Sequence, residues 1–331
     1  MAYSAAMTDS TWSEIEDAAA TGHPVSEAAA RAVLDTAAAD LPRLFAATAA
    51  LRQRRFGNRV QLCSILNARC GACSEDCAFC AQAACHGTPL ATYGLADAAA
   101  IRAARADAAK LPVCRFGVVT SGGTLNQEEV EQLAGTFRSD PAGDPAWCGS
   151  FGGLSQAQLA QLKAAGMVRF HHNLETARSF FPRICTTHTY DQRLATLRAA
   201  RAAGLELCSG GILGMGESPE QRVELALALA AERVESIPLN FLVAIPGTPL
   251  AGRPPLPPLE ILRGIAMFRL VNPGAEIKVC AGRLLLRNLQ SMIFHAGASG
   301  IMIGRLLTVA GRDPALDLQL LHDLELTPSE N

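Results

Sequence analysis

The chain has 331 residues, of which 49% are hydrophobic and 18% charged, and its net charge is −2. This composition can bury a large core, and the near-neutral charge gives no electrostatic footprint for nucleic acid. The apolar stretches are too short or too interrupted to supply the roughly 20 apolar residues that cross a bilayer. We therefore expect a cytoplasmic protein that binds small molecules, with neither a nucleic acid nor a membrane as partner.

Residues 1–56 are rich in alanine and predict an N-terminal helical extension. Two runs, 26–36 and 41–54, are compatible with helices, and Gly22, Pro24 and Pro42 are the helix breakers of this region. Leu34, Leu41 and Leu44 give these runs an apolar face. We expect disorder only near Met1.

From residue 57 onward, short apolar runs alternate with longer segments of helical period. The predicted strands cover 60–65, 113–120, 146–151, 167–173, 205–212, 236–243, 276–281 and 300–303. The predicted helices cover 97–110, 127–137, 155–165, 190–203, 219–233, 258–271, 283–296 and 314–324. Eight such units predict an α/β fold, a (β/α)8 TIM-type barrel over residues 57–331 with an N-terminal helical cap. An open doubly wound sheet would give the same alternation.

Three cysteines after the first predicted strand are the most informative motif. Cys73, Cys77 and Cys80 have the spacing Cys-x3-Cys-x2-Cys. Three thiolates on one short loop can hold three irons of a four-iron four-sulfur cluster, which leaves the fourth iron open. Such an open iron is typical of radical S-adenosylmethionine enzymes, in which the cofactor carries the chemistry and the protein orients it.

Zinc binding, disulfide formation and chance packing of thiols each account for this motif less well. A structural zinc site would need a second cysteine or histidine pair, and none follows at that distance. Disulfides would need an oxidising compartment, and the chain has an odd 11 cysteines. Buried thiols packed by chance remain an alternative. A noncatalytic iron–sulfur carrier would normally close its cluster with a fourth ligand.

Several further motifs follow in order, and together they resemble the biotin synthase family. They are the segments 63–68, 71–82, 170–176, 186–193, 208–217, 238–243 and 247–250. The resemblance spans about residues 57–325. It implies a barrel that converts dethiobiotin to biotin by radical insertion of sulfur, with S-adenosylmethionine as cofactor. It also implies a reducing electron carrier (flavodoxin or ferredoxin), a source of sulfide and a homodimer. The alternative is a related radical enzyme of the hydrogenase-cofactor maturase or mutase type, which inserts no sulfur.

By resemblance, Asn173 and Asn240 hydrogen-bond the ureido ring of dethiobiotin, because an amide both donates and accepts. Glu175 looks like the carboxylate that reads the adenosyl ribose or amino group. Arg193 matches an arginine near the methionine carboxylate, a target that suits a guanidinium fork. Without the motif, Arg193 would be read as a solvated charge on a helix.

The remaining predicted cofactor residues are on loops at the same face. Ser121, Gly122 and Gly123 form a glycine turn after the second predicted strand, and such turns bring backbone carbonyls against the methionine amino group. Phe79, inside the cysteine motif, joins the predicted cofactor-binding set.

A second, auxiliary cluster supplies sulfur in this family, and here the sequence departs from the usual pattern. Cys148 and Cys208 match two of its ligands, but Gly117 stands where a cysteine is usual and Lys278 where an arginine is usual. Cys280 lies two residues beyond Lys278, on the same face of the strand.

We therefore predict that Cys148, Cys208 and Cys280 hold a four-iron auxiliary cluster whose open iron can carry an extra sulfide. The alternative is a 2Fe-2S cluster with Lys278 as fourth ligand, although lysine is a poor iron donor. We expect Arg115 to help position the auxiliary cluster and Cys114 to pack on the opposite face.

The other thiols and the histidines receive no metal role. We interpret Cys63, Cys70, Cys85 and Cys185 as packing or incidental thiols, and Cys70 as a potential competitor during cluster assembly. We assign no metal to His171, His172 or His188.

Overall fold

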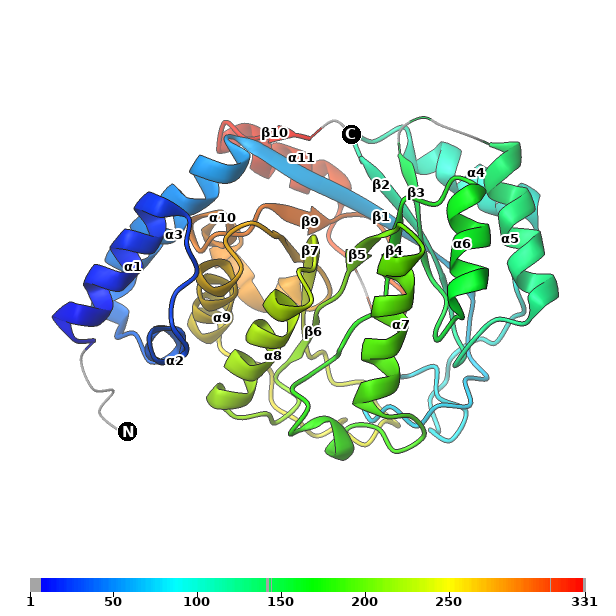
Figure 1. Cartoon of the computed structure of the whole chain (residues 1–331), viewed down its shortest axis with the longest axis horizontal. Coiled ribbons are helices and arrows are strands. Elements are labelled where there is room, and N and C mark those ends of the chain that lie inside the picture. The colour runs from blue at the N-terminus through cyan, green and yellow to red at the C-terminus, as the bar shows by residue number, and fades with distance from the viewer. Residues whose placement is uncertain (1–6, 141–142, 144, 310, 330–331) are drawn as a thin grey trace.

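The computed structural model describes residues 7–140, 143, 145–309 and 311–329, so Met1 lies outside the described part. The chain folds into a closed parallel barrel surrounded by helices (Figure 1), as the sequence predicted. The strands are β1 (Arg59–Arg69), β2 (Arg115–Thr120), β3 (Ala146–Ser150), β4 (Arg169–His171), β5 (Glu206–Cys208), β6 (Gly211–Leu213), β7 (Ser236–Phe241), β8 (Glu276–Val279), β9 (Gly300–Met302) and β10 (Thr327–Pro328).

The helices of the barrel follow its strands along the chain. They are α4 (Ala98–Ala108), α5 (Gln127–Ser139), α6 (Gln156–Ala164), α7 (Tyr190–Ala202), α8 (Pro219–Ala231), α9 (Pro258–Val271), α10 (Met292–His295) and α11 (Pro314–Asp323), with 3-10 turns η2 (Phe181–Arg183) and η3 (Arg283–Leu289). Four of them, α5 to α8, begin with a capping box, formed by Asn126, Ser155, Thr189 and Ser218. Each cap is worth about 1 kcal/mol and fixes where the preceding loop ends.

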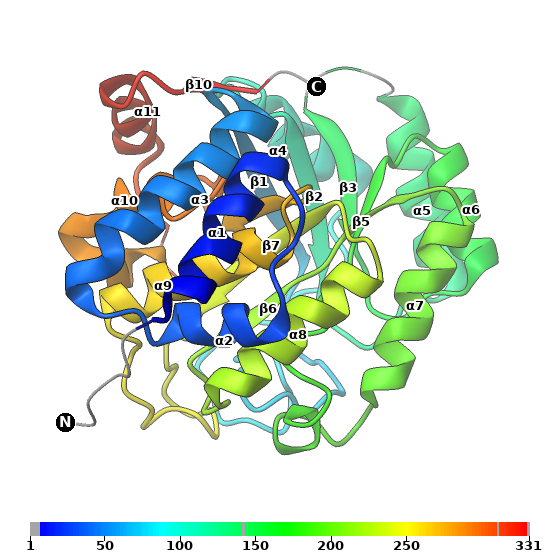
Figure 2. The ribbon, with the colours of Figure 1, turned by 60° about the vertical axis from the view of Figure 1, so that its left-hand side comes forward.

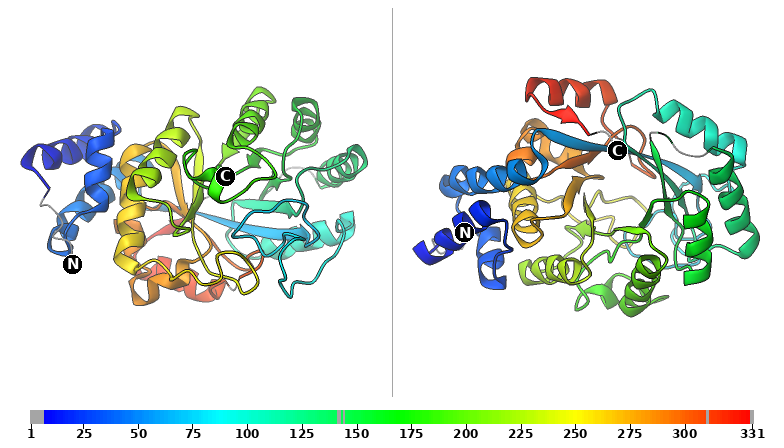
Figure 3. Two further views of the ribbon diagram at one scale, coloured as in Figure 1. Left: turned by 90° about the horizontal axis from the view of Figure 1, so that it is seen from below. Right: turned by 45° about the horizontal axis from the view of Figure 1, so that its top comes forward.

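The barrel closes because β1 pairs with both β2 and β9. The strand order from β1 to β9 follows the sequence, with β5 and β6 both pairing with β7. In the right-hand view of Figure 3, the helices form a ring around the strands. This excludes the open doubly wound sheet.

The N-terminal helices α1 (Asp9–Thr21), α2 (Glu27–Leu34) and α3 (Leu41–Phe56), with the 3-10 turn η1 (Ala38–Asp40), lie outside this ring. Figure 2 shows them against α8 and α9. Val25 donates its N–H to the Leu270 carbonyl at 3.1 Å, and Arg52 donates to the Ala298 carbonyl at 2.9 Å. The cap therefore covers the side of the barrel, and α1 is a helix that the sequence pattern did not delimit.

Two predicted elements differ from the structure. Residues 205–212 form two short strands instead of one, because a Cβ atom on Gly210 would lie 2.0 Å from the Pro238 carbonyl oxygen, so the two backbones approach too closely for a regular ladder. Residues 283–296 form η3 and α10 instead of one helix. The break falls at Arg287, where φ is 52° and ψ −122°.

The register places alternate residues of each strand inside the barrel. In parallel neighbours, Gly117 lies beside Cys148, His171 beside Cys208 and Pro238 beside Lys278. Paired residues of a sheet share a face, so these side chains belong to the interior. The other face packs against the helices, where Trp147 contacts Phe137 at 4.8 Å between ring centroids.

A membrane-crossing helix is absent from the described part of the chain, since none combines the length with the hydropathy that a bilayer requires.

Candidate active site

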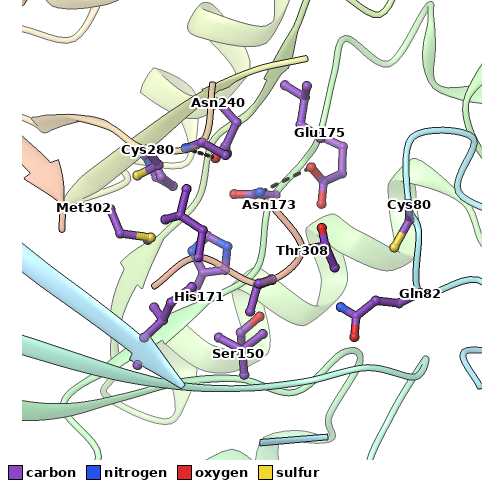
Figure 4. A pocket seen from close by; sticks show the side chains of 18 of the residues that line it. Cys80, Gln82, Ser150, His171, Asn173, Glu175, Asn240, Cys280, Met302 and Thr308 are labelled. Carbon is purple, nitrogen blue, oxygen red and sulfur yellow. Dashed lines mark hydrogen bonds between the residues drawn. The ribbon is translucent and has the colours of Figure 1, made fainter. Parts of the chain in front are cut away.

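A cavity of about 380 Å³ lies inside the barrel, and its lining runs from Arg115 and Arg169, at the amino ends of their strands, to the loops at the carboxyl ends. Both predicted cysteine groups line it. Cys73, Cys77 and Cys80 lie on the loop after β1, Cys148 and Cys208 lie on β3 and β5, and Cys280 directly follows β8. In Figure 4, Asn173, Asn240 and Glu175 project into the space between Cys80 and Cys280. One cavity therefore contains two groups of three thiols with polar side chains between them.

Backbone hydrogen bonds hold the loop of the first cysteine group in shape. Cys73 donates its N–H to the Gln82 carbonyl at 3.0 Å, and Cys80 donates to the Cys77 carbonyl at 2.9 Å. Cys77 is 8% exposed and Cys73 9%, so the sulfurs face the protein interior. The loop brings three thiols together at one wall of the cavity.

A second loop, residues 184–189, fastens the cysteine loop from outside. The Asp76 carboxylate accepts from the Thr186 N–H at 2.9 Å and from the Thr187 hydroxyl at 3.1 Å. The hydrogen bond from the Thr186 hydroxyl holds the pKa of Asp76 well below its usual range. His188 contacts Glu75 at 2.5 Å between Nδ1 and Oε2. Residues 184–189 are thus joined to the cysteine loop, which lies more than 100 residues earlier in the chain.

Arg193 is held within this network. Its Nε donates to His188 Nε2 at 2.9 Å, and its NH1 donates to the Asn173 carbonyl at 2.8 Å. Glu175 Oε1 lies 3.8 Å from the same guanidinium. Arg193 therefore has a fixed position on the cavity wall, with Glu175 beside it.

Glu175 has a strained backbone, with φ at 68°. Its N–H donates to the Gly210 carbonyl at 3.1 Å, and its carbonyl accepts from Ile212 at 2.8 Å. A Cβ on Gly211 would lie 2.3 Å from the Glu175 carbonyl oxygen, so the glycine permits this approach. Strain of this kind costs on the order of 1–3 kcal/mol and clusters at functional sites.

Hydrogen bonds within the chain fix the side-chain amides of Asn173 and Asn240, each of which donates one and accepts one. Asn173 donates to Glu175 Oε2 at 3.2 Å and accepts from the Gly210 N–H at 3.0 Å. Asn240 donates to the Gly211 carbonyl at 3.3 Å and accepts from the Ala281 N–H at 3.0 Å. Since an amide has two N–H donors and two lone pairs, each side chain keeps capacity for a ligand.

The glycine turn lies beside the cysteine loop. Ser121 and Gly122 line the cavity, and the Ser121 hydroxyl donates to the Gly71 carbonyl at 2.7 Å. The Ser121 carbonyl accepts from Arg69 Nε at 2.8 Å, and the Gly123 carbonyl accepts from the Gly153 N–H at 2.8 Å. The carbonyls of Ser121 and Gly123 are thus already engaged within the chain.

Phe79, Arg115 and the three barrel cysteines line the cavity. Arg115 NH2 lies 3.7 Å from Glu206 Oε2, at the deep end of the barrel. Cys114 is turned away, because its Sγ donates to the Leu62 carbonyl at 3.4 Å.

Burial favours the protonated form of Cys80, Cys148 and Cys280. Burial raises the pKa of Cys80 to about 11 and that of Cys148 to about 12, and it also raises the pKa of Cys280. A hydrogen bond with Cys185, together with burial, raises the pKa of Cys77. Such thiols release their protons when a metal binds. The donor set, six soft thiols in two groups of three, fits iron–sulfur clusters better than hard cations.

The surroundings of Lys278 and Gly117 indicate whether either position could supply a further ligand beside the second cysteine group. Lys278 Nζ donates to Cys63 Sγ at 3.0 Å and lies 3.3 Å from Glu276 Oε2. Burial lowers the pKa of Lys278, but its electrostatic interactions with Cys63 and Glu276 outweigh burial and raise that pKa overall. A Cβ on Gly117 would lie 3.1 Å from Ile65 Cγ2, so the Ile65 side chain occupies part of the room that a residue at 117 would need.

Sequence reasoning missed three residues of the site. Cys63 and His171 line the cavity, and His171 Nδ1 lies 3.3 Å from Cys208 Sγ. Cys185 Sγ lies 3.8 Å from Cys77 Sγ and also contacts Asp76, Thr187 and His188. The period of two along the first strand puts Cys63 and Ile65 on one face, but only the closed barrel shows that this face is the inner one.

Comparisons with known proteins define the class first. Residues 69–229 match the Radical SAM superfamily, and residues 238–327 match the Biotin and Thiamin Synthesis associated domain. The barrel with an open three-cysteine loop is that of a radical S-adenosylmethionine enzyme.

The relatives define the family. Biotin synthase of Maridesulfovibrio salexigens is 49% identical over 92% of this chain and 94% of that protein. Biotin synthase of Trichlorobacter lovleyi is 47% identical over 92% of each chain. The chain belongs to the biotin synthase family.

Solved structures share the fold at lower identity. The crystal structure of methylornithine synthase (PylB) has a TM-score of 0.82 at 19% identity, covering 96% of this chain and 97% of that one. The hydrogenase maturase HydG has a TM-score of 0.81 at 16% identity, covering 98% of this chain and 76% of that one. These similarities show the fold alone. They therefore do not support the alternative of a maturase or mutase.

Proposed function

We propose that this protein is a biotin synthase that inserts sulfur into dethiobiotin, using S-adenosylmethionine and two iron–sulfur clusters. The observation that carries the proposal is the pair of three-thiol groups lining one cavity, with Asn173 and Asn240 also on its wall. The names of the relatives, at 47–49% identity, support the substrate. Neither group of thiols alone would account for both a radical source and a sulfur source.

In this proposal Cys73, Cys77 and Cys80 hold the radical cluster. When bound, the clusters and S-adenosylmethionine supply a 5′-deoxyadenosyl radical and a transferable sulfur. The chain's own residues bind and orient. Arg193 directs its guanidinium to the methionine carboxylate, and Glu175 accepts from the adenosyl part. Ser121, Gly122 and Phe79 complete that wall, with Gly123 next to them in the same turn.

Asn173 and Asn240 hold the ureido ring of dethiobiotin. Each amide is already fixed by one donated and one accepted hydrogen bond inside the chain. Their remaining N–H groups and lone pairs match the C=O and N–H edges of a cyclic urea. Fixed amides lose little rotamer entropy on binding, which favours affinity.

For the auxiliary cluster, we propose four irons on Cys148, Cys208 and Cys280, with Arg115 nearby to position it. Lys278 is unsuited to be a ligand, because its ammonium already contacts Cys63 and Glu276. At position 117 the neighbouring Ile65 methyl takes up the space of a side chain. Three thiolates leave one iron open, and that iron can take a sulfide for transfer.

Iron analysis with an activity assay tests the proposal. The anaerobically reconstituted protein is analysed for iron, sulfide and Mössbauer spectrum, and is assayed for biotin with dethiobiotin, S-adenosylmethionine and a reducing flavodoxin or ferredoxin. About eight irons per chain with biotin formed is the expected result. About six irons with biotin formed would replace the four-iron auxiliary cluster by a 2Fe-2S cluster. About four irons without biotin would contradict the function itself.

A further inference from the structure

Cys63 is a fourth thiol that lines the same cavity as Cys148, Cys208 and Cys280. It lies on β1 in register with Arg115 of β2 and Met302 of β9, and all three residues line the cavity. Cys63 is 9% exposed. Cys63, Cys148 and Cys208 lie on β1, β3 and β5, and Cys280 directly follows β8, so the four thiols come from different sides of the barrel.

Lys278 reaches Cys63 through a gap in the intervening strand. β9 lies between β8, which carries Lys278, and β1, which carries Cys63. Lys278 pairs with Gly300 of β9, and a Cβ on Gly300 would lie 2.8 Å from Lys278 Cγ. Because this position is glycine, the lysine side chain crosses β9 and places its ammonium 3.0 Å from Cys63 Sγ.

The contact between Lys278 and Cys63 lies in a buried environment that contains a further charged group. Lys278 is 3% exposed, and Glu276 on the same strand lies 3.3 Å from its ammonium. Cys63 also interacts electrostatically with Cys148 and with Cys280. A buried ammonium with one carboxylate and one sulfur beside it stabilises negative charge on that sulfur.

We propose that Cys63 is an exchangeable fourth ligand of the auxiliary cluster. It binds the iron that Cys148, Cys208 and Cys280 leave open whenever that iron carries no sulfide, and it returns to the Lys278 ammonium when sulfide binds. The proposal rests on the four-iron auxiliary cluster proposed above.

The exchange balances without an oxidant or reductant. When hydrosulfide arrives, an iron–sulfur bond to it forms and the bond from iron to Cys63 Sγ breaks. Cys63 leaves as a thiolate, and the hydrogen bond from Lys278 compensates its charge. When the sulfide is consumed, the reverse change caps the iron again. The open iron is thereby protected between turnovers.

Cyanide binding to the auxiliary cluster tests this role without relying on turnover. The full chain is reconstituted with 57Fe and one sulfide per iron, so that no sulfide is surplus. Saturating S-adenosylmethionine then occupies the open iron of the radical cluster. 13C-cyanide is titrated into the reduced sample, and pulsed EPR detects its hyperfine coupling to the auxiliary cluster. Wild type is compared with Cys63→Ala and Cys63→Ser, the latter preserving side-chain size. Cys114→Ala, a buried thiol turned away from the cavity, is the matched control.

We expect both Cys63 variants to keep about four auxiliary irons and to bind cyanide at least about tenfold more tightly than wild type, with Cys114→Ala equal to wild type. Equal cyanide binding in all four proteins would overturn the role of Cys63 while leaving the four-iron cluster in place. Loss of auxiliary iron in the Cys63 variants would make Cys63 a permanent ligand and overturn the exchange. Two auxiliary irons in wild type would instead remove the cluster on which the proposal rests.

Discussion

Asn240 presents its amide to the cavity from the end of β7, and its inner edge is satisfied by Gly211 and Ala281. Asn240→Ala should remove the ureido contact and raise the KM for dethiobiotin about fivefold, since a hydrogen bond to a ligand contributes about 1 kcal/mol. Cleavage of S-adenosylmethionine in the absence of dethiobiotin should be unchanged. Steady-state kinetics with the exposed Asn58→Ala as control check this, and an unchanged KM would contradict the assigned contact.

Cys280 lies just beyond β8, on the same face as Lys278. Cys280→Ala should remove auxiliary iron and biotin formation but leave S-adenosylmethionine cleavage, because the radical cluster is on a different loop. Cys114→Ala should change neither. Iron analysis and detection of 5′-deoxyadenosine distinguish the two activities. A Cys280→Ala protein with full iron content and wild-type biotin formation would show that Cys280 is not a ligand.

At the scale of elements, one buried ion pair joins η3, which follows β8, to α11. Arg283 donates to Asp317 at 2.8 Å, Arg312 donates to the same carboxylate at 2.9 Å, and Asp317 is fully buried. The side chain of Arg283 also donates to Gln290 at 3.1 Å, across the break at Arg287. In a continuous helix, Arg283 and Gln290 would lie about two turns apart. The hydrogen bond between them therefore depends on the irregular backbone around Arg287.

Asp317→Ala should therefore destabilise the protein by about 3–5 kcal/mol, because it leaves Arg283 buried without a counter-charge. Asp313→Ala, which removes only the N-cap of the same helix, should cost about 1 kcal/mol. Urea unfolding of the two variants measures both effects. Equal losses for the two substitutions would mean that the buried pair contributes little beyond the helix itself.

The sequence predicted the alternation of strands and helices, the barrel and the radical-cluster loop, because period and cysteine spacing are local signals. It did not predict the break at Arg287 or the split at Gly210, which depend on contacts with distant segments. The placement of Cys63 also required the closed barrel, since a strand pattern alone does not say which face is inside. The assigned roles of the site residues stay predictions, as does the division into residues 1–56 and 57–331.

At the scale of the whole molecule, Glu276 links distant parts of the barrel. It accepts from Gln61 of β1 and, at 2.7 Å, from Arg169 of β4, and it lies 3.3 Å from Lys278. Burial raises the pKa of Glu276, but Lys278 and Arg169 outweigh it and hold that pKa at about 2, below the ordinary 4.5. A depressed carboxylate pKa stabilises the folded state above pH 4.5, and this stabilisation is lost as the pH falls toward 2.

The Glu276 carboxylate should thus contribute up to about 3 kcal/mol at neutral pH. Glu276→Gln should lower the free energy of unfolding by about that amount at pH 7, and its deficit should shrink as the pH falls from 4.5 toward 2, where wild type is protonated as well. The measurement is urea unfolding across this range on metal-free protein, because acid releases sulfide from iron–sulfur clusters. Exposed Glu131→Gln is the control and should track wild type throughout. A deficit for Glu276→Gln that stays constant with pH would mean that the barrel depends on the shape of this side chain and not on its charge.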